Sequence, residues 1–167
     1  MSHYCMSCGS KMQRVLLDHR MRERCSSCGW IYYPHLKVGA GTLIEKNDAV
    51  LLVRRANEPW KGFWYLPAGY VEADETPQIA AERETQEETG LIVRVGNLIE
   101  IYPFDDDPRG NGLLILYRAE VCGGELQCSD EASECSYFLA SELPSDIASK
   151  AHKQALADWA VGKAHGF

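Results

Sequence analysis

The sequence predicts an α/β domain preceded by a small cysteine-rich unit. Two observations support this: short β-branched stretches alternate with two helical segments along most of the chain, and two Cys-x-x-Cys pairs stand near its start. Pro34 marks the boundary, so we expect a first domain over residues 1–35 and a second over residues 36–167. A chain of 167 residues has room for one full domain with such an appendage.

The two cysteine pairs have the spacing of a zinc ribbon. Sixteen residues separate Cys8 from Cys25, and a glycine suited to a tight left-handed turn follows each pair. Four thiolates complete a tetrahedral shell, so we expect a structural Zn²⁺ that provides folding energy. The predicted ligands are Cys5, Cys8, Cys25 and Cys28. Without an export signal disulfides are not expected, so the remaining cysteines should be thiols: Cys122, Cys128 and Cys135.

The second domain contains one strongly marked helix, over residues 77–89. Thr76 is a suitable N-cap, Pro77 suits the first helical position, and Gly90 suits the C-terminal cap. The other expected elements are strands at 38–44, 49–53, 91–101, 113–121 and 135–139, and a final helix at 145–161. In that helix the candidate buried residues are Ile147, Ala151, Ala155, Leu156 and Trp159. This order predicts a sheet covered by helices.

Charge divides unequally between the two domains. Residues 1–35 carry five basic and two acidic side chains, a net of +3, so the net charge of −7 for the whole chain leaves −10 for residues 36–167. An acidic main domain repels a nucleic-acid backbone, although bound divalent cations can still attract small phosphorylated molecules. The sequence has no apolar run long enough for a bilayer and no signal-peptide pattern at its start, so we expect a soluble, cytoplasmic protein.

Three glutamates of the predicted helix indicate a cation site. At about 100° per residue, Glu84, Glu87 and Glu88 fall within an arc of roughly 100°, on the side that carries two alanines. The expected solvated face comprises Gln78, Glu82, Gln86 and Thr89. Like charges at these spacings destabilise a helix by about 0.2–0.5 kcal/mol per pair, so a bound cation would explain them. Oxygen ligands suit Mg²⁺ or Mn²⁺ rather than zinc.

The segment from Gly69 to Leu91 resembles the Nudix box. After the glycine come five residues, Glu75, seven residues, and then Arg83-Glu84-Thr85-Gln86-Glu87-Glu88-Thr89-Gly90-Leu91. Thr85 is the one departure, because the family has an aliphatic residue there. We expect this threonine to loosen the packing of the helix without changing the ligand set. The resemblance implies a Nudix α/β/α sandwich with a mixed sheet, preceded by the zinc ribbon.

The turn before the box and the cysteine-rich unit extend this resemblance. Trp64 and Leu66-Pro67-Ala68-Gly69 match the family's approach to the box, and the zinc ribbon is similar to that of a subgroup acting on FAD or ADP-ribose. The implied reaction is Mg²⁺-dependent hydrolysis of the diphosphate linkage in a nucleoside diphosphate joined to another group. Two monophosphates are the products. The resemblance also implies a homodimer.

Roles for individual residues follow from the same resemblance. It implies metal binding by Glu84, Glu87, Glu88 and the backbone carbonyl of Gly69, with Glu75 and Gly90 supporting the box. Arg83 is expected to orient Glu87, four residues on. The general base is expected to be Glu87, with Glu131 and Glu134 of a later loop as alternatives. Aromatic residues available to stack on the substrate are Tyr70, Trp60, Phe104 and Tyr102.

Two other functions are compatible with parts of the sequence. NADH pyrophosphatases also carry a four-cysteine ribbon, but the Ser-Gln-Pro-Trp-Pro-Phe-Pro segment of that branch is absent from residues 101–107. A nucleotide-sensing or nucleic-acid-binding protein could use the arginines at positions 20, 22 and 24 of the ribbon. The intact box favours catalysis, so both functions rank behind hydrolysis of FAD or ADP-ribose.

Overall fold

The computed structural model describes residues 3–165 of a chain that divides into two compact units, residues 1–35 and 36–167. The first unit is a three-stranded antiparallel sheet in the order β1-β2-β3. Its strands are β1 (Met12–Leu17), β2 (Arg20–Cys25) and β3 (Ile31–Tyr32). Its buried core is small and comprises Cys5, Met12 and Cys25, with Trp30 and Tyr32 packed against them.

The second unit is built on a seven-stranded mixed sheet. Its main path runs β10-β5-β4-β9-β8, in which β4 and β9 are parallel, while β6 pairs with β5 and β7 pairs with β4. The strands are β4 (Lys37–Lys46), β5 (Ala49–Arg55), β6 (Trp64–Tyr65), β7 (Ala68–Tyr70), β8 (Leu91–Phe104), β9 (Gly112–Gly124) and β10 (Ala132–Leu139). The helical elements are α1 (Pro77–Thr89), a short 3₁₀ helix (Ala140–Glu142) and α2 (Lys150–His165).

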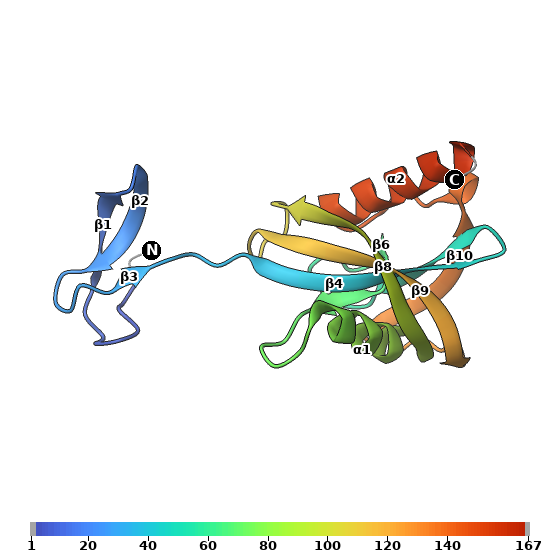
Figure 1. Cartoon of the computed structure of the whole chain (residues 1–167), viewed down its shortest axis with the longest axis horizontal. Helices are drawn as coiled ribbons and strands as arrows, with labels where there is room; N and C mark the ends of the chain where they lie inside the picture. Colours follow the sequence, from blue (N-terminus) through green and yellow to red (C-terminus); the bar gives the residue numbers. More distant parts are fainter. Residues whose placement is uncertain (1–2, 166–167) are drawn as a thin grey trace. The chain divides into compact units, whose positions relative to one another are not determined.

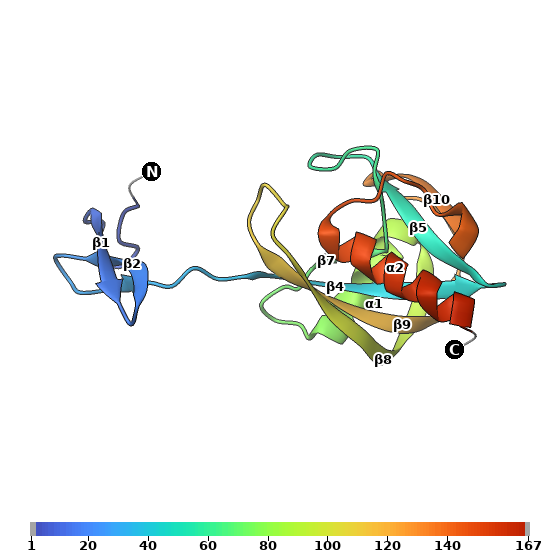
Figure 2. The same ribbon diagram turned by 90° about the horizontal axis from the view of Figure 1, so that it is seen from above.

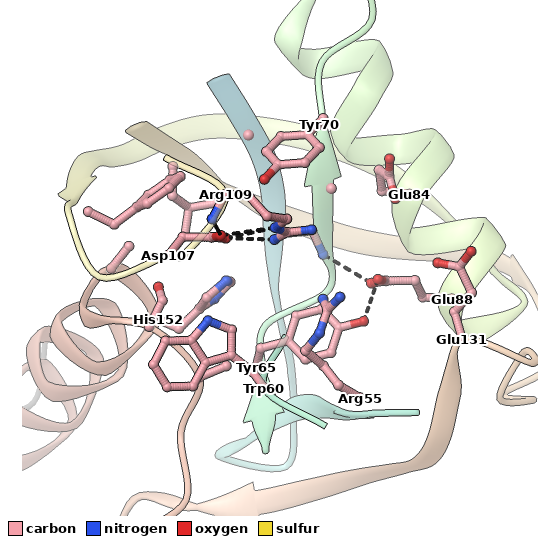
Figure 3. A pocket seen from close by; sticks show the side chains of 18 residues that line it. Arg55, Trp60, Tyr65, Tyr70, Glu84, Glu88, Asp107, Arg109, Glu131 and His152 are labelled. Atoms are coloured by element: carbon pink, nitrogen blue, oxygen red, sulfur yellow. Dashed lines mark hydrogen bonds and ion pairs between the residues drawn. The ribbon is translucent and has the colours of Figure 1, made fainter. Parts of the chain in front are cut away.

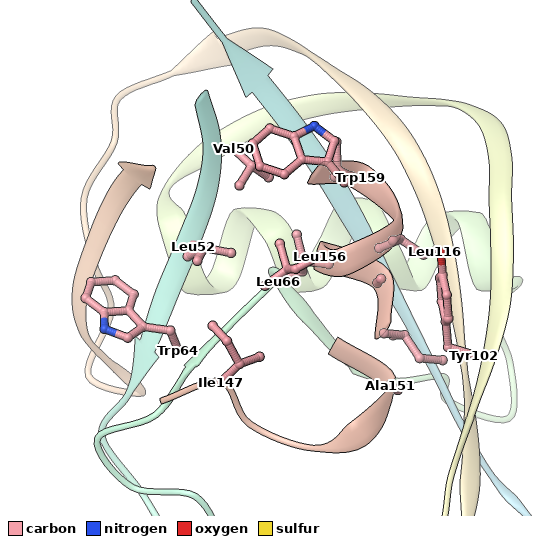
Figure 4. Close-up of a cluster of buried hydrophobic side chains, with 13 residues drawn as sticks. Val50, Leu52, Trp64, Leu66, Tyr102, Leu116, Ile147, Ala151, Leu156 and Trp159 are labelled. Carbon is pink, nitrogen blue, oxygen red and sulfur yellow. The ribbon is translucent and has the colours of Figure 1, made fainter. Parts of the chain in front are cut away.

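The two helices cover opposite faces of this sheet (Figures 1 and 2). Helix α1 packs on β4, β7 and β8, whereas α2 packs on β8. The largest buried cluster lies between the sheet and α2, where Leu52, Leu66, Leu116, Leu156 and Trp159 interdigitate (Figure 4). A smaller cluster lies under α1, around Ala80 and Ala81. The predicted α/β/α sandwich with a mixed sheet is therefore confirmed. Within residues 3–165, neither helix is long and apolar enough to cross a membrane.

Helix α1 forms where its capping residues predict it. The side chain of Thr76 accepts a hydrogen bond from the Ile79 amide, Pro77 is the first helical residue, and Gly90 ends the helix at φ 71°. One part of the amphipathic pattern is wrong: Thr89 is completely buried rather than solvated. Its hydroxyl donates to the Thr85 carbonyl at 2.5 Å, which satisfies the buried oxygen within the helix.

Helix α2 starts later than predicted, at Lys150 rather than at residue 145. The preceding residues extend along β6 instead, because the Trp64 amide donates to the Asp146 carbonyl and the Ala148 amide donates to the Trp64 carbonyl. Ile147 is buried as expected, but by this pairing and not by a helix. The other predicted buried positions of α2 are confirmed: Ala151, Ala155, Leu156 and Trp159.

The expectation that all three remaining cysteines are thiols is also wrong. Cys128 and Cys135 are joined in a disulfide with 5.9 Å between their Cα atoms, and Cys122 is free and exposed. The loop before β10 folds back on the end of α1, where the Gln127 amide donates to the Thr89 carbonyl at 2.9 Å. This return brings Cys128 next to the strand that carries Cys135, at a Cα separation usual for disulfides.

Candidate active site

Arg83 connects the charged residues of α1. Its guanidinium donates two hydrogen bonds to Glu75, at 2.6 and 3.1 Å, and one each to Glu84 at 2.8 Å and Glu87 at 3.0 Å. It also donates to the Tyr70 carbonyl at 3.1 Å. The hydrogen bonds to Arg83 lower the pKa of Glu75, and Glu75 in turn raises that of Arg83. One arginine therefore holds Glu75 and the Tyr70 backbone, which precede the helix, together with two glutamates of the helix, Glu84 and Glu87.

Glu88 is the most buried of the three clustered glutamates, with 4 % of its surface exposed. Its carboxylate accepts a short hydrogen bond from the Tyr65 hydroxyl and a 3.1 Å bond from the Ala68 amide (Figure 3). Burial raises the pKa of Glu88 to about 8, although these two hydrogen bonds act in the opposite direction. The sheet therefore holds a carboxylate that a nearby cation would stabilise in its charged form.

Glu84 lies directly on the backbone of Gly69. A β-carbon built on residue 69 would coincide with the Glu84 carboxylate, so only glycine leaves room for it. Burial also raises the pKa of Glu84, against the effect of Arg83. Glu87, in contrast, has a side chain that is 60 % exposed. The predicted metal ligands thus differ strongly in their surroundings.

A cavity of about 220 Å³ opens beside these residues. Glu84, Glu88 and Glu131 line one part of it, and Arg55 and Arg109 add positive charge. Its other walls include Gly69, Tyr70, Trp60, Tyr65, Phe104 and His152. Acidic, basic and aromatic groups thus converge on one concave site, as expected for an active site that binds a charged aromatic ligand.

Arg109 is held in the cavity by Asp107. Its guanidinium donates through Nε and Nη2 to the Asp107 carboxylate, at distances from 2.6 to 3.2 Å, and lies over the Tyr70 ring at 5.2 Å. Arg55 lies over the Tyr65 ring at 5.1 Å, and its Nε donates to the Pro59 carbonyl at 3.0 Å. Both contacts leave guanidinium nitrogens for a ligand.

The structure brings Gly69, Glu84 and Glu88 to the wall of this cavity, whereas Glu75, Arg83 and Glu87 are not among its lining residues. Tyr70, Trp60 and Phe104 line it, whereas Tyr102 is buried in the core. Glu131 lines it, whereas Glu134 is exposed and contacts Arg54 at 3.5 Å. Gly90 caps α1, away from the cavity lining. Sequence reasoning missed Arg55, Tyr65, Arg109 and His152, because strand pairing and the start of α2 bring these residues to the site from separate elements.

Thr85, the departure from the family pattern, does not loosen α1. It is completely buried, and its hydroxyl donates to the Ala81 carbonyl at 2.7 Å. The Thr85 hydroxyl also lies 2.7 Å from that of Thr42 on β4. Because Thr85 gives its proton to Ala81, Thr42 must be the donor of this second bond. A polar pair therefore replaces the apolar contact between helix and sheet.

The cysteine cluster lies in the first unit. Sγ atoms of Cys5, Cys8, Cys25 and Cys28 all lie within 4.8 Å of one another, and no other group of three or more His, Cys, Asp or Glu side chains in residues 3–165 has its ligand atoms this close together. Gly9 and Gly29 adopt positive φ angles of 73° and 79°, as their positions after the cysteine pairs predict. Their amides donate to the Cys5 and Cys25 carbonyls, which closes the two turns.

Comparison with known proteins agrees with this arrangement. The NUDIX domain family matches residues 34–159, and the Nudix N-terminal family, a zinc ribbon, matches residues 3–34. An ADP-ribose pyrophosphatase of Methanocaldococcus jannaschii is 43 % identical over 113 residues, which cover 67 % of each chain. The NAD-capped RNA hydrolase NudC of Pseudomonas aeruginosa is 33 % identical over 144 residues, or 86 % of this chain but 50 % of that protein.

A solved structure matches nearly the whole chain. The crystal structure of a NUDIX hydrolase from Nitrosomonas europaea has a TM-score of 0.84 and 31 % identity, and the match covers 98 % of this chain and 93 % of the other. This chain spans about half the length of the NudC proteins it resembles. With the NUDIX domain matched over residues 34–159, the chain belongs to the Nudix hydrolase family and carries that family's N-terminal zinc ribbon.

Proposed function

We propose that the protein hydrolyses the diphosphate linkage of a nucleoside diphosphate joined to another group, with ADP-ribose as the first candidate and FAD as the second. The observation that carries the proposal is the presence of two α1 glutamates, Glu84 and the buried Glu88, in the wall of a cavity that also holds two arginines. The name of the Methanocaldococcus jannaschii relative favours ADP-ribose. For ADP-ribose the products would be AMP and ribose 5-phosphate.

The donor set fits a hard divalent cation, as Nudix enzymes generally use. Glu84, Glu87 and Glu88 offer only oxygen atoms, which suit Mg²⁺ or Mn²⁺. Two of these carboxylates have pKa values raised by burial, so a nearby cation would favour their ionised forms. We therefore propose these glutamates and the Gly69 carbonyl as ligands. A bound cation would supply charge neutralisation for the diphosphate and would make water more acidic.

The cavity's arginines have the chemistry to bind the two phosphates. Arg109 and Arg55 each keep guanidinium nitrogens without a hydrogen-bond acceptor among residues 3–165, and guanidinium groups form paired hydrogen bonds with phosphate. Asp107 holds Arg109 in place, and the Tyr65 ring supports Arg55. We propose that these side chains position the linkage beside α1 and stabilise its developing charge.

A carboxylate must accept the proton of the attacking water. The new bond joins the water oxygen to phosphorus, the bridging P–O bond breaks, and the leaving phosphate takes the electron pair. Glu87 remains our first proposal for this base, since Arg83 holds it beside Glu84. Glu131 is the alternative, because it lines the cavity together with Glu84 and Glu88.

The test is product analysis with a panel of ADP-ribose, FAD and NADH in the presence of Mg²⁺. We expect two monophosphates from ADP-ribose, and a loss of about a hundredfold or more in kcat for Glu87→Gln. Glu131→Gln separates the two proposed bases, and Glu120→Gln, at an exposed position on β9, is the matched control. A folded, metal-supplied protein that cuts none of these compounds contradicts the proposal.

A second candidate substrate class is NAD(H), free or as an RNA cap. The NudC relatives carry this activity in their name, and their similarity covers 86 % of this chain in the Pseudomonas aeruginosa case. NADH in the panel, followed by NAD-capped RNA, decides between the two classes. Preferential cleavage of either one would move ADP-ribose to second place.

Three further properties stay predictions. We propose that Cys5, Cys8, Cys25 and Cys28 bind a structural Zn²⁺, since their sulfur atoms cluster with ligand-like spacing. Cytoplasmic location and a homodimer are the expectations drawn from the sequence. Fractionation of cells and sedimentation of the purified protein would test these last two.

A further inference from the structure

Two buried polar atoms in the cavity have no hydrogen-bond partner among residues 3–165. They are Nε1 of Trp60 and Nδ1 of His152. Both side chains line the cavity, and Figure 3 shows them at the end away from Glu84 and Glu88. A buried polar group without a partner costs about 1–3 kcal/mol, and such groups are rare in native structures. Two of them in one cavity indicate that a ligand supplies the partners.

The two atoms have complementary hydrogen-bonding characters. An indole nitrogen is always a donor. Burial, followed by the charge of Arg55, lowers the pKa of His152 to about 3, so its imidazole is neutral near pH 7. A neutral imidazole with its proton on Nε2 presents Nδ1 as an acceptor. The cavity then offers one donor and one acceptor to a single ligand group.

Packing fixes both side chains before any ligand binds. Trp60 adopts a positive φ of 69°, which is costly for a bulky residue, and its ring packs edge-to-face on Phe63 at 5.5 Å. His152 lies in the first turn of α2, where its ring meets the edge of Tyr65 at 5.7 Å. Asp106 anchors that turn by accepting the Lys150 amide at 2.9 Å. Such rigidity favours selective binding.

The group that fits is a planar heterocycle with a donor next to an acceptor. A 6-aminopurine has this pattern, since its amino group is adjacent to ring nitrogens. ADP-ribose, FAD and NADH all contain adenine, and in ADP-ribose adenine is the sole aromatic ring. Phe104 and Leu114 also line the cavity and supply apolar contact for such a ring. Adenine is therefore the occupant common to all the candidate substrates.

We propose that Trp60 and His152 form the purine-recognition site of this enzyme. The Trp60 indole donates to a ring nitrogen of adenine, and His152 Nδ1 accepts from the 6-amino group. The inference rests on the proposed function, because it identifies adenine as the part of the substrate that is held away from the diphosphate. Hypoxanthine, with a carbonyl at C6 and a proton on N1, presents the opposite pattern on that edge.

Equilibrium binding of AMP and IMP to the metal-free full chain, measured by calorimetry, tests the proposal without catalysis. We expect AMP to bind roughly tenfold or more tightly than IMP, as for a site built to hydrogen-bond its ligand. Trp60→Phe keeps an aromatic ring but removes the donor, and His152→Phe keeps the contact with Tyr65 but removes the acceptor. Each should bring the AMP-to-IMP ratio close to one. Trp30→Phe, in the first unit, is the control and should retain the wild-type ratio.

Several results would overturn the proposal. Equal affinities of the wild type for AMP and IMP would overturn it, whether or not the variants fold. An unchanged ratio of AMP to IMP affinity in a folded Trp60→Phe protein would also overturn it. Tighter binding of IMP would contradict the assignment of the Trp60 indole as donor to a ring nitrogen and of His152 Nδ1 as acceptor from the 6-amino group. Tighter binding of FMN or nicotinamide mononucleotide than of AMP, lost in the variants, would assign the site to the other half of the substrate. An AMP preference without hydrolysis of ADP-ribose, FAD or NADH would instead contradict the proposed function and leave purine recognition standing.

Discussion

The Glu84 carboxylate occupies the space that a β-carbon on Gly69 would fill, so the Glu84 side chain of α1 packs directly against the backbone of β7. Gly69→Ala must therefore displace Glu84 from its position beside Arg83. We expect kcat to fall about a hundredfold, since a shift of about 1 Å in a reacting group has effects of that size. Steady-state kinetics and the unfolding free energy should be measured together.

Gly162→Ala is the matched control for this substitution. Residue 162 lies inside α2, and a β-carbon there meets no atom within 4 Å. Alanine should stabilise that helix by about 0.5–1 kcal/mol and leave kcat unchanged. Wild-type kcat in Gly69→Ala would show that the position of Glu84 does not matter for the reaction.

The hydrogen bond between Thr42 and Thr85 predicts non-additive effects on stability. Thr85→Val removes the acceptor of the Thr42 hydroxyl and leaves that buried group unpaired, which should cost about 1–3 kcal/mol. Adding Thr42→Val removes the orphaned group, so the double variant should be more stable than Thr85→Val alone. Denaturant unfolding of the four proteins in the cycle measures this coupling. Strict additivity would mean that the two hydroxyls contribute independently.

The same pair shows what the sequence could and could not predict. The box residues, the caps of α1 and the cysteine pairs are local patterns, and the structure has α1 over Pro77–Thr89 as predicted. Thr85 looked like a packing defect because its partner, Thr42, is 43 residues away in the chain. A long-range hydrogen bond leaves no local periodicity, so only the folded sheet identifies it.

The start of α2 and the residues that line the cavity could not be predicted from the sequence for the same reason. Residues 145–149 have a helix-compatible pattern, but Asp146 to Ala148 pair with Trp64 of β6, and Ser149 adopts a positive φ of 49° just before α2 begins. That pairing sets the position of His152, and it also determines which residues face the cavity. Tertiary pairing overrode local propensity here. Arg55 and Arg109 are ordinary surface-type arginines in the sequence, and only strand order brings them together.

Asp107 should act on catalysis through Arg109. Asp107→Ala removes the carboxylate that accepts from Nε and Nη2 of Arg109, so the guanidinium loses its fixed orientation in the cavity. If Arg109 binds the diphosphate equally in ground and transition states, KM for ADP-ribose should rise about tenfold with little change in kcat. The kinetic constants should be compared with those of Asp130→Asn, an exposed control. An unchanged KM would remove Arg109 from the binding site.

Metal loss should unfold the first unit selectively. Its buried core comprises Cys5, Met12 and Cys25, and two of these three are predicted ligands. Cys8→Ser or a strong chelator should therefore release zinc and make residues 1–35 sensitive to protease, while the second unit keeps its unfolding transition. Zinc content and limited proteolysis provide the readouts. Cys122→Ser, at an exposed free cysteine, should retain the metal. A protease-resistant ribbon without zinc would refute this account.

Glu88 should make the metal-free protein less stable as the pH rises. Its pKa is about 8 in the folded protein against an ordinary value of 4.5, so between these values the folded state binds a proton that the unfolded state has lost. Unfolding free energy must then fall across this window, by at most about 1.4 kcal/mol per pH unit. Denaturant titrations with EDTA from pH 5 to about pH 8 would measure the slope.

Glu88→Gln should remove that slope, because a glutamine does not titrate and can still accept from the Ala68 amide. Tyr65→Phe should instead raise the pKa of Glu88 further. It deletes a hydrogen bond that lowers the pKa of Glu88, so the decline in stability should extend to higher pH. Mg²⁺ competes with the proton for this carboxylate, so its stabilising effect should grow as the pH rises towards 8. A stability that stays constant from pH 5 to about pH 8 in wild type and Glu88→Gln alike would show that Glu88 is already ionised when folded.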